Sequence, residues 1–181
     1  MPNLYSSISP ALEERARRIE LIVLDVDGTL TDGLLVFTDS GEEIKRFHVR
    51  DGHGIVMARR VGLKFVAVSG RRSRATLKRM REWGIEETHQ KIWDKETFVT
   101  QLLQRRGLDW SQLAYMADDV VDLRAMRRCG LALAPADAVP EIHATAHWVS
   151  TLGGGCGAVR EALEWILKAK GLWDKAMEPY R

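Results

Sequence analysis

The stretch LIVLDVDGT, residues 21–29, decides the fold. It opens with a continuous apolar run, and a short run without polar alternation is typical of a strand buried on both faces. Asp25 and Asp27 follow the run, and Gly28 then allows the backbone to turn sharply into a loop. The stretch therefore predicts a buried strand that delivers two carboxylates to one edge of a sheet.

Comparable apolar runs recur along the chain and alternate with helical patterns. Strands are expected over residues 64–68, 113–116, 131–133 and 147–149, and helices over 52–61, 73–82, 95–106 and 120–128. Another helix is expected at 11–19, and a last one at 158–170 follows the glycine-rich stretch 153–157. Alternation at this spacing indicates βαβ units. We expect an α/β fold with a parallel sheet covered by helices on both faces.

The segment between the first two sheet strands has a different pattern. Apolar residues at 34–37 and 44–49 flank a turn signal at 39–42, which predicts a small β-hairpin over about 34–49. A chain of 181 residues suits one domain, 1–181, whose C-terminal helix and tail occupy about 158–181. We therefore expect a single domain in which the hairpin is the largest excursion from the sheet.

Composition excludes several classes of function. The formal net charge is +2, and the basic clusters at 71–74 and 78–81 lack the interleaved aromatic residues of a nucleic-acid site, so we expect no nucleic-acid partner. No apolar run approaches the roughly 18 residues that would span a bilayer, so no membrane partner is expected. Cys129 and Cys156 lie far apart in the chain, which fits a reducing compartment. We expect a cytoplasmic protein.

Acidic residues gather where the predicted strands end. In an open parallel sheet the carboxyl ends of the strands meet at one edge. Carboxylates that close repel one another unless a cation lies between them, and oxygen ligands favour Mg²⁺ over zinc. Capping of turns is the alternative reading for Asp27 and Asp119, and a calcium loop would need its glycine later than Gly28. The residues concerned are Asp25, Asp27, Asp118, Asp119 and Asp122.

The same edge carries the groups needed for phosphoryl transfer. Asp25 is placed to attack phosphorus, and Asp27 could protonate the leaving oxygen and later activate water. Ser69, the Gly70 amide and Lys95 supply hydroxyl, amide and cationic donors for the phosphoryl oxygens. Taken singly, Ser69 is an ordinary cap and Lys95 an ordinary surface lysine. Their order along the chain is what predicts a catalytic set.

This order of motifs resembles the haloacid dehalogenase (HAD) superfamily of phosphotransferases. The resemblance rests on residues 25–29, Ser69, Lys95 and residues 116–122, and covers nearly the whole chain. It implies a three-layer Rossmann-like fold, an aspartyl-phosphate intermediate on Asp25, and Asp27 as general acid and base. It also implies Mg²⁺ held by Asp25, Asp118 and the carbonyl of Asp27, with Asp119 and Asp122 behind these ligands.

Within the superfamily the chain looks most like small capless phosphatases of 3-deoxy-D-manno-octulosonate 8-phosphate, a sugar-acid phosphate of lipopolysaccharide synthesis. The similar segments are residues 30–33, 47–55 and 157–161. Capless members resemble one another in forming homotetramers in which a neighbour's hairpin and tail cover the site. Arg50, Arg71 and Arg160 are candidate contacts for the substrate's anionic groups.

Three positions depart from that pattern and leave the substrate open. Lys91 and Ala117 stand where the resemblance leads us to expect glycine, and Cys156 stands where it leads us to expect arginine. Cysteine cannot pair with a carboxylate as arginine does. The phosphatase-like small subunit of an aryl-phosphate carboxylase, such as phenylphosphate carboxylase, is an alternative that is compatible with the six tryptophans.

Two further alternatives come from other classes of protein. A non-enzymatic interaction subunit with the HAD fold would tolerate loss of the catalytic set, yet Asp25, Asp27, Ser69, Lys95 and Asp118 are all present. A receiver domain carries its acidic pair on the first strand and its phosphorylated aspartate on a later one, unlike the stretch at 25–29.

Overall fold

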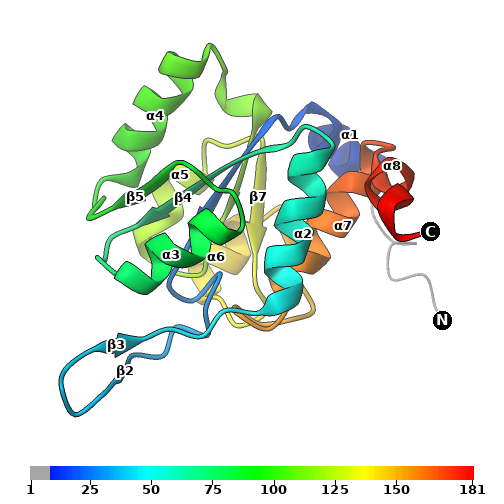
Figure 1. Cartoon of the computed structure of the whole chain (residues 1–181). Helices are drawn as coiled ribbons and strands as arrows, with labels where there is room; N and C mark the ends of the chain where they lie inside the picture. The colour runs from blue at the N-terminus through cyan, green and yellow to red at the C-terminus, as the bar shows by residue number, and fades with distance from the viewer. Residues whose placement is uncertain (1–8) are drawn as a thin grey trace.

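The computed structural model describes residues 9–181 and has a six-stranded parallel sheet at its centre (Figure 1). The strand order is β5-β4-β1-β6-β7-β8, and every neighbouring pair is parallel. The strands are β1 (Leu21–Asp25), β4 (Lys64–Ser69), β5 (Thr88–Gln90), β6 (Leu113–Met116), β7 (Leu131–Ala134) and β8 (Trp148–Val149). The expected α/β fold with a parallel sheet is confirmed.

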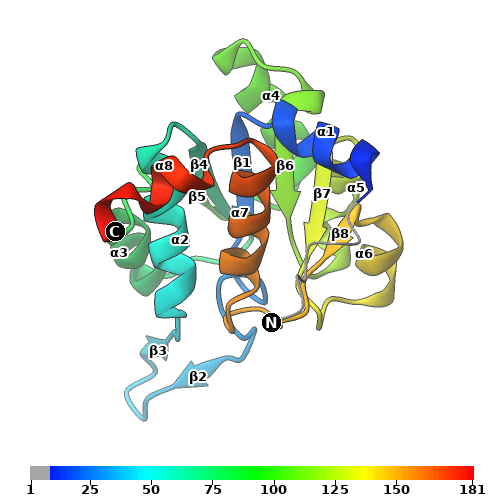
Figure 2. The same ribbon diagram turned by 90° about the vertical axis from the view of Figure 1, so that its right-hand side faces the viewer.

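Helices cover both faces of the sheet (Figure 2). They are α1 (Pro10–Arg18), α2 (Val49–Arg60), α3 (Arg74–Glu82), α4 (Lys95–Arg106), α5 (Leu123–Met126), α6 (Pro140–Thr145), α7 (Ala158–Ala169) and α8 (Trp173–Met177). Successive side chains of β1 point to opposite faces. Ile22 and Leu24 pack with residues of α1, α2 and α7, whereas Leu21 and Val23 pack with residues of α4, α5 and α6. Burial on both faces explains why β1 is apolar throughout.

The order of the strands places β1 where the chain reverses direction across the sheet. β4 pairs with one side of β1 and β6 with the other, so Asp25 lies opposite Val68, and Leu24 lies opposite Met116. Ligand sites of open α/β sheets lie beyond the carboxyl ends of the strands at such a point. The topology therefore brings the ends of β1, β4 and β6 together.

The structure refines several expected elements. The helix expected at 120–128 is a 3₁₀ turn, Val120–Asp122, followed by the short α5, and residues 47–49 do not extend the hairpin, because α2 begins at Val49. The sequence did not predict the polar edge strand β5, the short helix α6 or the tail helix α8. Each has fewer residues than a clear helical or strand period needs.

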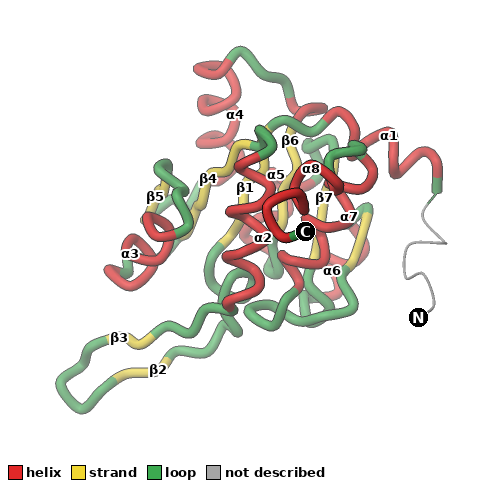
Figure 3. Tube along the Cα trace, turned by 45° about the vertical axis from the view of Figure 1, so that its right-hand side comes forward, coloured by secondary structure: helices red, strands yellow, loops and turns green. Residues whose placement is uncertain are grey.

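The hairpin consists of β2 (Val36–Phe37) and β3 (Glu43–Ile44), and it projects away from the sheet and its helices (Figure 3). Its apolar side chains face outward: Leu34 is 66% exposed and Phe37 is 56% exposed. Soluble monomers seldom leave neighbouring apolar side chains uncovered. The hairpin therefore carries a group of neighbouring exposed apolar side chains, namely Leu34, Leu35, Val36, Phe37 and Ile44.

Over residues 9–181, none of the helices is both long enough and apolar enough to cross a membrane.

Candidate active site

Lys95 and Asp25 form the buried centre of the site. Lys95 Nζ lies 2.5 Å from Asp25 Oδ1 and 2.7 Å from Asp122 Oδ1. The hydroxyl of Tyr115 also donates to Asp122 Oδ1, at 2.6 Å. The side chains of Lys95 and Asp122 are 3% and 0% exposed, so solvent contributes little to holding them. Asp122 therefore fixes the ammonium group that faces Asp25.

Local structure explains how Lys95 reaches this position. Lys95 is the first residue of α4, and Asp94 caps the helix by accepting from the backbone N–H of Thr97 at 3.1 Å. Such a cap satisfies one of the free donors of a first helical turn. The cap fixes where α4 begins and so directs Lys95 toward the end of β1.

Burial dominates the electrostatics of this centre. It raises the pKa of Asp25 well above the usual carboxyl value, although the Lys95 ammonium acts in the opposite direction. Burial alone would lower the pKa of Lys95, but the carboxylates of Asp25 and Asp122 outweigh it and raise that pKa. The raised pKa keeps Lys95 protonated and positively charged. Further positive charge at this edge would favour the ionised form of Asp25.

Asp118 lies on the other side of the loop that follows β1. Its Oδ1 accepts from the hydroxyl of Thr29 at 3.2 Å, and burial raises its pKa to about 6. Gly28 has a φ of +91°, and a Cβ there would overlap the Asp118 carboxylate. Gly28 therefore serves both the backbone conformation and the close approach of Asp118.

The donors at this edge fit a magnesium ion. A cation here would be held by the carboxylates of Asp25 and Asp118 and by a main-chain carbonyl such as that of Asp27. Among residues 9–181, no group of three or more His, Cys, Asp or Glu side chains is arranged to hold a metal ion by side chains alone. Oxygen ligands of this kind, completed by water, suit Mg²⁺. Burial raises the pKa of both carboxyl groups, and a bound cation would favour their ionised forms.

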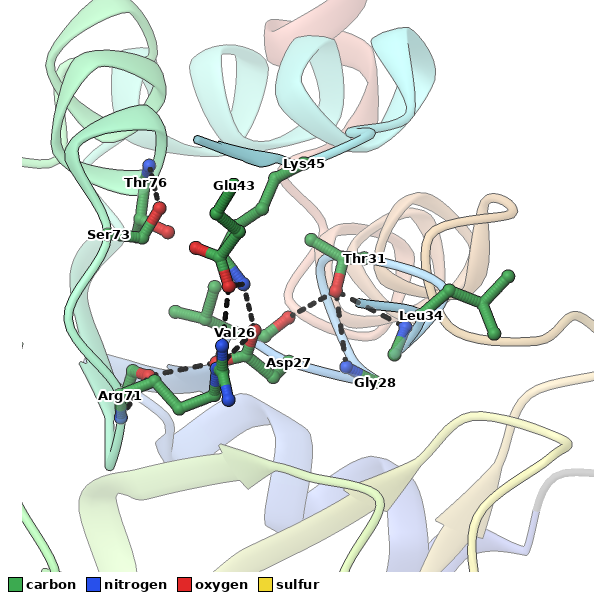
Figure 4. Close-up of polar contacts among 12 residues, drawn as sticks. Val26, Asp27, Gly28, Thr31, Leu34, Glu43, Lys45, Arg71, Ser73 and Thr76 are labelled. Carbon is green, nitrogen blue, oxygen red and sulfur yellow. Dashed lines mark hydrogen bonds and ion pairs between the residues drawn. The ribbon is translucent and has the colours of Figure 1, made fainter. Parts of the chain in front are cut away.

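The side chain of Asp27 meets Lys45 of the hairpin (Figure 4). Its Oδ2 accepts from the Ser69 hydroxyl at 3.0 Å, and its Oδ1 contacts Lys45 Nζ. Arg71 Nε lies 4.0 Å from the same Oδ1, and an Arg71 guanidinium nitrogen lies 2.6 Å from Glu43 Oε1. The expected general acid is thus contacted by groups from the end of β4, from the loop after it and from the hairpin.

Sequence reasoning missed Lys45, Glu43, Tyr115 and Thr29. Glu43 and Lys45 are two apart in an extended segment and share a face, opposite to the exposed Ile44. That alternation was the available signal. Tyr115 belongs to a strand buried on both faces, where its hydroxyl requires a partner.

The remaining predicted residues lie around the site or apart from it. Asp119 caps the 3₁₀ turn through the Val120 N–H at 2.7 Å, as the capping alternative expected. Gly70 lies against the exposed ring of Trp93. Arg50 and Arg160 line a separate hollow that none of Asp25, Asp27, Ser69 and Lys95 lines, and Arg160 Nε pairs with Glu164 at 2.6 Å.

The departures also have positions in the structure. Lys91 has a φ of +61°, the left-handed conformation that glycine adopts most readily. Ala117 is fully buried, and Cys156 is exposed beside Arg50 and Arg160. The first departure therefore lies near Gly70 and Trp93, and the last lies in the separate hollow.

The parallel sheet and the acidic edge around Asp25 define a phosphotransferase of the HAD class. A curated relative from Salmonella typhimurium, the 3-deoxy-D-manno-octulosonate 8-phosphate phosphatase KdsC, is 37% identical over 172 residues, covering 95% of this chain and 92% of the relative. The chain therefore belongs to the family of 3-deoxy-D-manno-octulosonate 8-phosphate phosphatases, which confirms the resemblance inferred from the sequence. A comparison with models of protein families gave no match.

Solved structures agree with this assignment. A 3-deoxy-D-manno-octulosonate 8-phosphate phosphatase from Moraxella catarrhalis, in complex with magnesium, phosphate and KDO, has a TM-score of 0.91 at 34% identity and covers 94% of this chain and 98% of that one. The phosphatase from Yersinia pestis has a TM-score of 0.90 at 36% identity and covers 92% and 90%. The expected three-layer HAD fold, with a small hairpin in place of a cap, is confirmed.

Proposed function

We propose that this protein is a Mg²⁺-dependent phosphomonoesterase that hydrolyses 3-deoxy-D-manno-octulosonate 8-phosphate to the free sugar acid and phosphate. The observation that carries the proposal is the meeting of Asp25, Lys95 and Asp118 at the end of β1, with Asp27 and Ser69 beside them. Membership of the phosphatase family and the magnesium, phosphate and KDO bound by the Moraxella relative support the substrate and the metal.

The reaction takes place in two displacements at phosphorus. One oxygen of Asp25 forms a bond to phosphorus while the bond to the ester oxygen breaks, and Asp27 gives its proton to that leaving oxygen. Asp27 then takes a proton from water, whose oxygen bonds to phosphorus as the Asp25 oxygen leaves. Phosphate is released, and the Asp25 carboxylate and protonated Asp27 are restored.

The other residues hold charge while phosphorus changes partners. Lys95 orients Asp25 and would bind a phosphoryl oxygen, and the Ser69 hydroxyl, which donates to Asp27 in the free protein, would donate to a phosphoryl oxygen once substrate is bound. Mg²⁺, bound by Asp25, Asp118 and the Asp27 carbonyl, would supply further positive charge beside those oxygens. Asp119 and Asp122 contribute indirectly, through the 3₁₀ turn and through Lys95.

The test is a panel of phosphate esters: the octulosonate phosphate, hexose phosphates and phenylphosphate, each with Mg²⁺ and with a chelator. We expect release of phosphate from the sugar acid, and its loss on chelation. Turnover that survives the chelator would contradict the role of the metal. A preference for phenylphosphate would instead favour the alternative hypothesis, the phosphatase-like small subunit of an aryl-phosphate carboxylase.

The proposal extends to assembly and location. A homotetramer, in which a neighbour's hairpin covers the site, is supported by the outward apolar side chains of Leu34, Leu35 and Phe37. Exclusion of water from the aspartyl-phosphate is the benefit of such a cover. We place the reaction in lipopolysaccharide synthesis in the cytoplasm, where Cys129 and Cys156, both free thiols here, would stay reduced.

A further inference from the structure

Lys45 directly follows β3, and its side chain turns inward. Its side chain is 3% exposed, whereas that of the adjacent Arg46 is 78% exposed. Ordering a lysine side chain costs conformational entropy. A buried ammonium is also costly unless it is paired. Lys45 is therefore held by specific partners, and those partners are in the active site.

Lys45 and Ser69 hold the Asp27 carboxylate from two sides. Lys45 Nζ contacts Oδ1, and the Ser69 hydroxyl donates to Oδ2 at 3.0 Å. One group comes from the hairpin and the other from the end of β4. A carboxylate whose two oxygens are both engaged cannot rotate without breaking a contact. The orientation of Asp27 is thus set jointly by the sheet and the hairpin.

Glu43 and Arg71 extend this arrangement (Figure 4). Glu43 Oε1 lies 3.6 Å from Lys45 Nζ and 2.6 Å from an Arg71 nitrogen. Burial alone would raise the pKa of Glu43, but the hydrogen bond from Arg71, helped by Ser73 and Lys45, outweighs it and lowers that pKa. Glu43 is therefore a carboxylate that links Lys45 to Arg71.

We infer that Lys45 is a positioning residue, which aims the Asp27 carboxyl at the leaving oxygen of the substrate. The inference rests on the proposed function, in which Asp27 is the general acid. A general acid must lie within hydrogen-bond reach of the atom it protonates, and a misplacement of about 1 Å can cost about 10²-fold in rate. Lys45 thereby links the hairpin to the general acid of its own chain.

Three substrates separate this role from the others that a buried lysine could have. Cleavage of the sugar-acid ester and of a simple alkyl phosphate expels a basic alkoxide that needs protonation, whereas p-nitrophenyl phosphate expels a stable anion that does not. We expect Lys45→Met to lower kcat/KM by about 10²-fold on both alkyl esters and to lower it far less on p-nitrophenyl phosphate. Arg46→Met, the matched control on the same hairpin, should change none of the three.

Lys45→Arg guards against loss of folding in Lys45→Met. The charge and the buried stem remain, but the wider guanidinium displaces the Asp27 carboxyl. We expect a smaller loss that is again confined to the alkyl esters. Circular dichroism of each variant reports whether the fold is kept.

Other patterns would overturn the inference. An equal loss on all three substrates would mean that Lys45 merely stabilises the hairpin. A loss confined to the sugar acid would make it a substrate ligand. Wild-type turnover in the same assay reports the proposed function separately, because that proposal fails when the wild type does not release phosphate, whatever Lys45 does.

Discussion

The edge of the sheet and the hairpin both supply charged groups to one site, but they hold them in different ways. At the edge, Lys95, Asp122 and Tyr115 come from core elements and satisfy one another out of contact with solvent. On the hairpin, Glu43 and Lys45 turn inward while Leu34 and Phe37 stay exposed. The charged groups at the edge are thus paired within the sheet and its helices, whereas no part of residues 9–181 covers the outer apolar side chains of the hairpin.

The largest expected effect breaks the edge at the nucleophile. Asp25→Asn keeps the shape and an acceptor for Lys95 but cannot form an aspartyl-phosphate. Removing a covalent nucleophile costs orders of magnitude, so phosphate release should fall by at least about 10³-fold. The measurement is initial-rate phosphate release with Mg²⁺, and an unchanged melting temperature shows that the fold is intact. Near-normal turnover by this variant would refute the assignment of Asp25.

The second effect tests whether Asp122 is the shared hydrogen-bond and ion-pair partner that holds Lys95 and Tyr115. Asp122→Ala leaves Lys95 and the Tyr115 hydroxyl without their shared partner, and breaking a buried pair in this way costs about 3–5 kcal/mol in the free energy of unfolding. Tyr115→Phe is the matched control, because it removes one donor and leaves the ion pair, which should cost about 1–3 kcal/mol. Urea denaturation compares the two. Equal losses would mean that Asp122 does not hold Lys95.

The same contrast decides what could be predicted from the sequence. The buried edge was predictable, because an apolar run ending at Asp25 identifies a strand, and parallel strands bring their ends together. Asp122 was assigned a place behind the metal ligands, and the structure adds its contacts with Lys95 and Tyr115. These depend on which side chains meet across β6 and α4, which the spacing along the chain does not encode.

The hairpin was predictable as an element but not as part of the site. Its charged residues resemble a solvated turn, and only the alternation around Ile44 distinguishes Glu43 and Lys45 from it. Arg50 and Arg160 show the opposite case. They were natural candidates as cations in motif segments, yet the fold gathers them in a separate hollow. Charge alone did not say which side chains would line the same hollow.

The third effect acts on the hairpin surface. The double variant Leu35→Ser/Phe37→Ser removes apolar side chains that are 49% and 56% exposed, so the free energy of unfolding of a single chain should change by no more than about 0.5 kcal/mol. The oligomer should become smaller, with a several-fold loss of activity. Size-exclusion chromatography with light scattering measures the mass. Val149→Thr, at an exposed apolar position on β8, is the control that should leave the mass unchanged.

The smallest effect concerns Lys91, which directly follows β5 and lies near Gly70 and Trp93. A non-glycine residue in the left-handed region costs about 1–2 kcal/mol, whereas glycine loses about 0.5–1 kcal/mol more chain entropy on folding. With φ at +61°, Lys91→Gly should therefore stabilise the protein by less than about 1 kcal/mol, seen as a small rise in melting temperature. Lys91→Ala keeps the backbone cost and should not show that rise. A fall in stability for Lys91→Gly, with no fall for Lys91→Ala, would mean that the left-handed backbone at this position is not strained.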